Sequence, residues 1–86
     1  MKNLKLFYLA YCPYCKKALK YIDELQNSEE KYKDITIEMI EESQNRALAN
    51  RYDYYLVPCF YIDEKKVHEG AADKSDIKNV FDMAIE

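Results

Sequence analysis

Apolar residues change their spacing several times along the chain, and each change marks a predicted element. Residues 4–10 form a short and nearly continuous apolar run, which is typical of a central strand. From Pro13 the apolar residues recur at helical spacing, which predicts an amphipathic helix that fades near residues 26–28. Residues 34–39 alternate between apolar and polar side chains, which predicts a half-buried strand.

A second helix is expected after this strand. Ser43 is suited to cap its N-terminus, and Pro58 prevents it from continuing. Tyr52 and Tyr55 fall on the helical repeat, so we place both rings on the core face. Tyr54 then points elsewhere and is available to contact a partner.

The last part of the chain predicts two more strands and a helix. Residues 59–62 and 66–69 are the strands, and the charged residues 63–65 form the turn between them. Asp73 or Ser75 can cap the last helix. The element order β-α-β-α-β-β-α indicates an α/β fold with a four-stranded mixed sheet flanked by three helices. The first two strands are expected to be parallel, through a right-handed crossover.

Length and composition limit what this fold can contain. The chain has 86 residues, 49% of them hydrophobic, and no Gly/Ser-rich linker or repeat, so we interpret residues 1–86 as one domain. A core of this size leaves little room for a large enclosed pocket, and chemistry at a surface edge suits it better.

Charge and cysteine content argue against several classes of function. The net charge is −3 and no run of Lys and Arg exceeds two residues, so a nucleic-acid surface is not expected. No apolar stretch approaches the ~20 residues of a membrane span, and the N-terminal residues lack a signal-peptide cleavage site. Three cysteines, an odd number, argue against a disulfide-stapled secreted framework. We therefore expect a cytoplasmic monomer without a membrane or nucleic-acid partner.

Two cysteines spaced C-x-x-C lie where the first strand ends and the first helix begins. The unpaired N–H groups and the positive dipole end of that helix stabilise an anion at Cys12. Pro13 suits the first helical position, and Lys16 and Lys17 add positive charge nearby. Each effect is expected to lower the pKa of Cys12 from about 8.5. Cys15 lies about one helical turn further on and points inward, within reach of the Cys12 sulfur.

This arrangement predicts dithiol redox chemistry. Cys12 would attack a disulfide as the nucleophile. Cys15 would then resolve the mixed disulfide by closing a redox-active Cys12–Cys15 disulfide.

The motif and its setting resemble the glutaredoxins, which have a thioredoxin-like fold. The Cys-Pro-Tyr-Cys sequence of residues 12–15 is similar to the active-site motif of dithiol glutaredoxins, and a Val-Pro step at residues 57–58 precedes the third predicted strand. The resemblance covers nearly the whole chain. It implies a glutathione-dependent disulfide oxidoreductase that acts on protein disulfides or glutathione mixed disulfides, with glutathione as co-substrate and no metal.

Several further residues match glutathione contacts of that family. The resemblance implies a cis bond at Pro58 and pairing of the Val57 backbone with the cysteinyl part of glutathione. It also implies that Arg51 meets a glutathione carboxylate and that Tyr14 borders the groove. The remaining implied contacts, to the γ-glutamyl end, are Ala72 and Asp73.

Three positions depart from the family pattern and leave a second reductant open. Leu56 stands where Thr often precedes Val-Pro, and Leu9 stands where Lys or Arg commonly meets glutathione. Glu69 replaces a glycine and would add negative charge near the groove. Loss of one charge-assisted contact typically costs about 1.5–3 kcal/mol. A thioredoxin-type or other thiol reductant is therefore the alternative.

A metal site is an alternative of a different class. Three thiolates and an imidazole form a recognised zinc ligand set, and the chain offers Cys12, Cys15, Cys59 and His68. An iron–sulfur cluster on Cys12 and a non-catalytic interaction domain are further alternatives. The simpler interpretation of Cys59 is a buried small hydrophobe, with a regulatory thiol near Cys12 as the alternative, and His68 is expected to be exposed on an edge strand.

Overall fold

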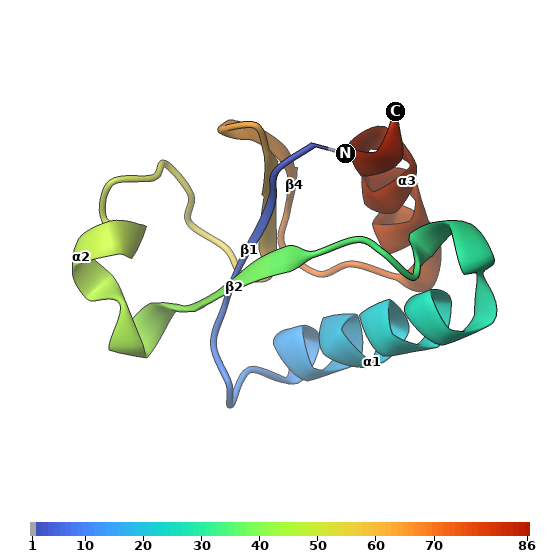
Figure 1. The fold of residues 1–86 in the computed structure, drawn as a ribbon. Coiled ribbons are helices and arrows are strands. Elements are labelled where there is room, and N and C mark those ends of the chain that lie inside the picture. Colours follow the sequence, from blue (N-terminus) through green and yellow to red (C-terminus); the bar gives the residue numbers. More distant parts are fainter. Residues whose placement is uncertain (1) are drawn as a thin grey trace.

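Four strands form one mixed sheet at the centre of the protein. The structure is a computed structural model that describes residues 2–86 (Figure 1). In the sheet order β2-β1-β3-β4, the strands are β2 (Ile37–Glu41), β1 (Leu4–Tyr8), β3 (Cys59–Ile62) and β4 (Lys65–Glu69). β1 pairs with β2 in parallel, and the β1–β3 and β3–β4 pairs are antiparallel.

Helices cover both faces of this sheet. They are α1 (Pro13–Ser28), α2 (Arg46–Ala49) and α3 (Lys74–Ile85), with short 3-10 turns at Glu30–Tyr32 and Glu42–Gln44. α1 and α3 lie together on one face, and α2 lies on the other (Figure 1). The predicted α/β class, with a four-stranded mixed sheet and three helices, is confirmed. Within residues 2–86 no helix combines the length and the apolar character that a membrane crossing requires.

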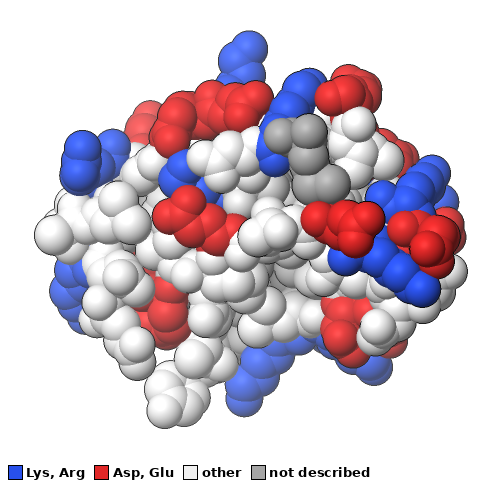
Figure 2. Space-filling model, in the orientation of Figure 1, with Lys and Arg blue, Asp and Glu red and all other residues white. Residues whose placement is uncertain are grey.

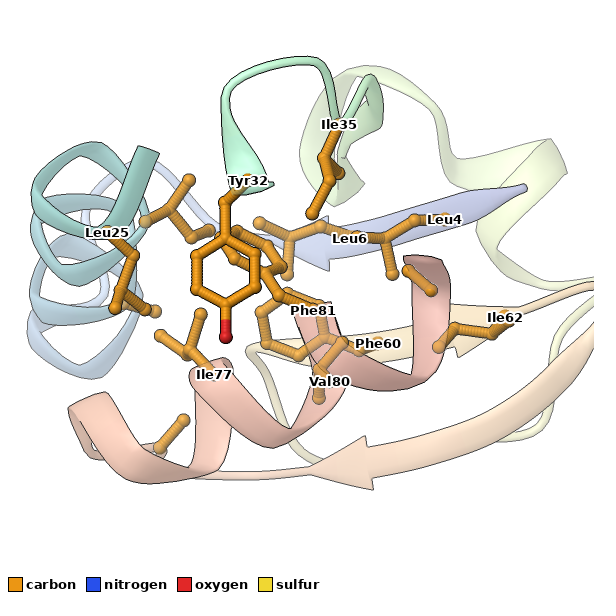
Figure 3. Packing of buried hydrophobic residues seen from close by; sticks show 14 residues of the cluster. Leu4, Leu6, Leu25, Tyr32, Ile35, Phe60, Ile62, Ile77, Val80 and Phe81 are labelled. Carbon is orange, nitrogen blue, oxygen red and sulfur yellow. The ribbon is translucent and has the colours of Figure 1, made fainter. Parts of the chain in front are cut away.

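The larger core lies between the sheet and helices α1 and α3. Leu4 and Leu6 of β1 point into it, because alternate side chains of a strand share one face of the sheet. Tyr32 and Phe81 meet there with ring centroids 5.2 Å apart (Figure 3). The Tyr32 hydroxyl donates to the Asp82 carboxylate, which ties the turn after α1 to the last helix.

The opposite face of the sheet carries a smaller, aromatic core. The rings around Phe7 of β1 are those of Tyr52, Tyr54 and Tyr61, with centroids 4.8, 5.0 and 5.6 Å away. Tyr55 is 91% exposed, so our placement of Tyr55 in the core and of Tyr54 outside it is wrong. The physical reason is that α2 ends at Ala49. Beyond it the chain follows no helical repeat, and residues two apart share a face as they do in an extended chain.

Two other expectations about this region are also wrong. Ser43 does not cap a helix: its hydroxyl donates to Glu41 Oε1 (2.5 Å), and that carboxylate accepts the Gln44 N–H (3.2 Å). The second strand lies at Ile37–Glu41 rather than 34–39, because its extent follows the parallel pairing with β1 rather than its own alternation.

The elements nearest the cysteines lie close to their predicted positions. β1 ends at Tyr8, two residues earlier than expected, and β3 spans the predicted residues 59–62. Asp73 is the N-cap of α3, and it forms a capping box with Asp76.

Candidate active site

Cys12 lies at the junction between β1 and α1, as predicted. It is the N-cap of α1, with extended backbone angles (φ −76°, ψ 124°), and Pro13 is the first helical residue. The Cys12 N–H donates to the Leu9 carbonyl (3.2 Å), and the Cys12 carbonyl accepts the Lys16 N–H (3.0 Å). These bonds form the turn that places a partly exposed thiol at the helix N-terminus.

The first turn of α1 lowers the pKa of Cys12. The backbone N–H of Cys15 is the largest cause, and the Cys15 side chain and the Tyr14 N–H add to it against the opposing effect of partial burial. A thiolate at this position faces amide groups that have no partner within the helix. Lys16 and Lys17 are exposed, and the lowering comes from the helix backbone and Cys15 rather than from these ammonium groups.

Cys15 has the opposite environment. Its side chain is buried in the first turn of α1, and its sulfur accepts the Leu9 N–H at 3.4 Å. Burial is the largest cause that raises the pKa of Cys15 to about 11, and the neighbouring charges of Cys12 and Glu42 also raise it. The pair therefore consists of one thiol with a lowered pKa and a second thiol beside it with a raised pKa.

Three of the residues predicted to bind glutathione line one groove, and one of them, Tyr14, lies between the two cysteines in the sequence. Tyr14, Ala72 and Asp73 border a hollow of about 300 Å³ between the start of α1 and the start of α3. Lys17 and Asp76 also line it, so the groove offers one cationic and two anionic side chains. Since a tripeptide carries both ammonium and carboxylate groups, this mixture is chemically suited to one.

Val57 and Pro58 lie at the same end of the sheet. The bond between them is cis, and Pro58 is buried directly before β3. Because Phe7 pairs with Cys59 in antiparallel register, the chain entering β3 runs beside the chain leaving β1 toward Cys12. The Pro58 carbonyl accepts the Gly70 N–H at 2.9 Å, which connects this segment to the end of β4.

Arg51 is not part of this arrangement. It lines a separate hollow of about 450 Å³, on the side of the sheet that carries α2, together with Tyr52, Tyr61 and Glu64. Glu64 belongs to the β3–β4 turn, at the end of the sheet away from Cys12. The loop after α2 therefore carries Arg51 away from the groove, and we remove it from the set of glutathione contacts.

The four candidate zinc ligands are not assembled. Within residues 2–86 no three His, Cys, Asp or Glu side chains gather as a metal site requires. Cys59 is buried in the aromatic core, where burial raises its pKa to about 12. His68 is half-buried rather than exposed, with Nε2 at 3.1 Å from the Gly70 carbonyl oxygen and 3.2 Å from that of Ala71.

Two glutamates near the site hold loop backbone groups, a role that their local sequence does not predict. Glu41 accepts the Ala10 N–H at 2.8 Å and so anchors the turn before Cys12. Glu69 does not face the groove as a free charge, because its carboxylate accepts the N–H groups of Tyr55 (2.5 Å) and Leu56 (2.9 Å). Neither contact has a signal in the local sequence, since each joins segments more than ten residues apart.

Large apolar side chains are exposed in the segments around the cysteine pair. Tyr11 and Tyr14 flank Cys12 along the chain, and Tyr55 and Leu56 lead into Val57. The lower left of the surface in Figure 2, where the chain turns from β1 into α1 in Figure 1, is mostly uncharged. Elsewhere on that face acidic and basic side chains are interspersed.

Comparison with solved structures identifies many chains of the same fold. A mutant thioredoxin from Halobacterium salinarum is 25% identical, with a TM-score of 0.71 over 99% of this chain and 75% of the other. A thioredoxin-like protein from Clostridium perfringens is also 25% identical, with a TM-score of 0.67 over 98% and 71%. Thioredoxin O1 from Arabidopsis thaliana, in its oxidised state, is 20% identical and superimposes with a TM-score of 0.75 over 100% and 79%.

A comparison with protein families agrees with these structural neighbours. No curated protein matches the sequence. The family described as "Thioredoxin domain" matches residues 2–82, which is nearly the whole chain. The fold, the family match and the position of the cysteine pair agree, and the chain belongs to the thioredoxin domain family.

Proposed function

We propose that the protein is a dithiol thiol–disulfide oxidoreductase that reduces protein disulfides through Cys12 and Cys15. The observation that supports this most directly is the contrast between the two thiols. Cys12 is partly exposed at a helix N-terminus that lowers its pKa, whereas Cys15 is buried beside it with a raised pKa. This contrast supports Cys12 as the nucleophile and Cys15 as the resolving thiol.

The reaction begins at Cys12. Its thiolate attacks one sulfur of the substrate disulfide, the substrate S–S bond breaks, and the departing thiolate takes a proton from water. The product is a mixed disulfide between Cys12 and the substrate. The negative charge on Cys12 is then gone, and with it one of the causes that raise the pKa of Cys15.

Resolution follows from this change. Cys15 loses its proton to solvent and attacks the Cys12 sulfur, which releases the second substrate thiol and closes the Cys12–Cys15 disulfide. The substrate gains two electrons and two protons, and the protein dithiol loses them. A dithiol or thiol reductant then restores Cys12 and Cys15.

Two candidates exist for that reductant: a thioredoxin-type reductase and glutathione. Glutathione could also form part of the substrate, as a mixed disulfide. The groove lined by Tyr14, Lys17, Ala72 and Asp73 favours it, because the groove includes the first turn of α1, which follows Cys12, and carries both signs of charge. The separate position of Arg51 and the apolar Leu9 weaken it. The similarity to thioredoxins favours a thioredoxin-type reductant, so we place glutathione second.

Cysteine variants test the mechanism. With a disulfide-bonded peptide as substrate, we expect Cys12→Ser to abolish reduction. Cys15→Ser is expected to accumulate a mixed disulfide, visible as an increase in mass that dithiothreitol reverses. Cys59→Ala is the matched control, because it removes a buried thiol outside the proposed chemistry, and it should retain activity. Full activity of Cys12→Ser would contradict the proposal.

The same variants distinguish the reductants. If glutathione serves, reduction of a glutathione mixed disulfide survives in Cys15→Ser and is lost in Cys12→Ser, and its rate saturates with glutathione concentration. If a thioredoxin-type reductase serves, activity requires both cysteines and does not saturate with glutathione.

A further inference from the structure

One carboxylate holds the segment that leads into Val57 and Pro58. Glu69, the last residue of β4, accepts the N–H groups of Tyr55 and Leu56 through Oε2 at 2.5 and 2.9 Å. Its other oxygen, Oε1, accepts a hydrogen bond from Lys66 Nζ at 2.7 Å. Both oxygens are thus occupied by donors, and these donors lower the pKa of Glu69 to about 2, which keeps it ionised.

This segment has few other constraints. Within residues 2–86, no backbone–backbone hydrogen bond involves residues 53–57. The side chains of Tyr55 and Leu56 are exposed, so packing does not hold them, although Leu56 rests against Gly70. In Figure 1 the loop between α2 and β3 stands away from the sheet before it enters β3. Tyr54 packs on Phe7 and Pro58 is buried, so these two residues fix the ends of the short stretch 55–57, and Glu69 holds the backbone of residues 55–56 between them.

The start of the same loop is fixed in a similar way. The Asp53 carbonyl accepts hydrogen bonds from the Tyr61 hydroxyl (2.6 Å) and from Lys66 Nζ (3.2 Å). Lys66 therefore joins the two fixed points, since it also pairs with Glu69. Side chains of β3 and β4 thus form hydrogen bonds with this loop, whose residues 53–57 make no backbone–backbone hydrogen bond within residues 2–86.

We infer that Glu69 is a positioning residue that shapes residues 55–57 to receive an extended polypeptide substrate. The inference rests on the proposed function. The backbone groups of Val57 make no hydrogen bond within residues 2–86, so they are available to a substrate strand. Fixing the two preceding residues in advance removes part of the ordering cost of binding. Because the chain entering β3 runs beside the chain leaving β1, we expect a polypeptide joined to Cys12 to extend along this segment and a small disulfide to stop short of it.

Substitution of Glu69 tests this with two substrates. With an extended disulfide-bonded peptide, we expect Glu69→Ala to raise KM about tenfold, the equivalent of one lost charge-assisted interaction, while kcat stays within about twofold. With hydroxyethyl disulfide no comparable rise in KM is expected. Amide hydrogen exchange at Tyr55 and Leu56 should become faster in the variant.

Two further variants complete the test. Glu30→Ala is the matched control, because it removes a carboxylate that pairs with a lysine, Lys33 at 2.9 Å, in the turn after α1, and it should change neither KM. Glu69→Gln keeps a weaker acceptor, and we expect a smaller rise of about two- to threefold for the peptide. If Glu69→Ala does not fold, Glu69→Gln decides the question.

The inference is overturned if the peptide KM is unchanged in the folded variants, or if KM rises in the same proportion for both substrates. Failure of the proposed function has a different signature. In that case the wild-type protein itself reduces neither substrate, whereas failure of the inference leaves the wild type active.

Discussion

Cys12 and Cys15 are one helical turn apart, yet they differ in exposure and in the direction of their pKa shifts. Cys12 faces the amide groups of the first turn, and Cys15 faces the core. A thiolate is stabilised by the first environment and destabilised by the second, so their pKa values move in opposite directions. The local geometry therefore favours ionisation of Cys12 over that of Cys15.

Alkylation of the folded protein tests this contrast at the residue scale. We expect the iodoacetamide reaction of Cys12 to titrate with a midpoint below about 8.5, the value of free cysteine. Cys15 and Cys59 should stay unmodified at pH 8, because their pKa values are raised to about 11 and about 12. Mass spectrometry after proteolysis locates the label.

The denatured protein is the control for this measurement. There all three cysteines should react with similar midpoints, because the helix and the core are lost. A Cys12 midpoint at or above the value in the denatured protein would contradict the assigned roles.

At the scale of elements, the short second helix shows where periodicity misleads. Tyr52 and Tyr55 fit a helical repeat, but α2 ends at Ala49. Tyr52 packs against the aromatic core, whereas Tyr55 is exposed. The competing interaction is the tilted packing of the Tyr52 and Tyr54 rings against Phe7, which requires residues two apart to face the sheet. Burial of two rings against a third outweighs the weak preference of this segment for a helix.

The last helix has a stronger local signal, and its cap can be tested. Asp73 Oδ1 accepts the Asp76 N–H at 2.9 Å, and Asp76 Oδ2 accepts the Asp73 N–H at 3.1 Å. We expect Asp73→Ala to lower Tm by a few degrees at pH 7, measured by circular dichroism, because the Asp76 N–H loses its side-chain acceptor at the start of α3. Lys78→Ala, in the same helix, is the control and should have a smaller effect.

The pH dependence of this effect has a definite sign. The Ser75 hydroxyl and the Asp76 N–H lower the pKa of Asp73 in the folded protein. Its stabilising contribution is therefore present above the unfolded pKa, about 3.9, and is lost as the pH falls through the folded value. The Tm difference between wild type and Asp73→Ala should shrink in acid. A difference that grows in acid would contradict the capping role.

At the scale of the whole molecule, the sheet separates two cores of different character. The larger one is covered by α1 and α3, and the smaller one by α2 and the tyrosines of the following loop. Tyr32 connects distant parts of the larger core, because its ring packs on Phe81 and its hydroxyl reaches Asp82, 50 residues away.

Substitutions at Tyr32 measure this connection. We expect Tyr32→Phe to lower the free energy of unfolding by about 1 kcal/mol, since it removes one hydrogen bond and leaves Asp82 accessible to water. Tyr32→Ala should cost about 3–5 kcal/mol, because it also opens a cavity. Urea denaturation gives both values. Tyr55→Phe is the control for loss of an exposed hydroxyl, and an equal effect of the two Phe variants would show that the Asp82 contact contributes nothing.

Local sequence patterns were sufficient to predict the features that depend on neighbouring residues. The apolar run of residues 4–10, the helical repeat after Pro13 and the candidate caps Asp73 and Ser75 are local patterns. They predicted β1, α1 and α3, although β1 ends at Tyr8 and the cap is Asp73. The cysteine pair belongs to the same class. Its position at the end of a strand and the start of a helix follows from the pattern around it, and the helix N-terminus supplies the effect on Cys12.

The folded structure set the contacts that join distant segments. It separated Arg51 from the groove, placed Tyr54 rather than Tyr55 in the core, and paired Glu69 with backbone groups 13 and 14 residues away. Each of these outcomes is set by packing and hydrogen bonds between strands and loops that are remote in the chain. Such contacts depend on the register and faces of the assembled sheet, which no local run of residues specifies.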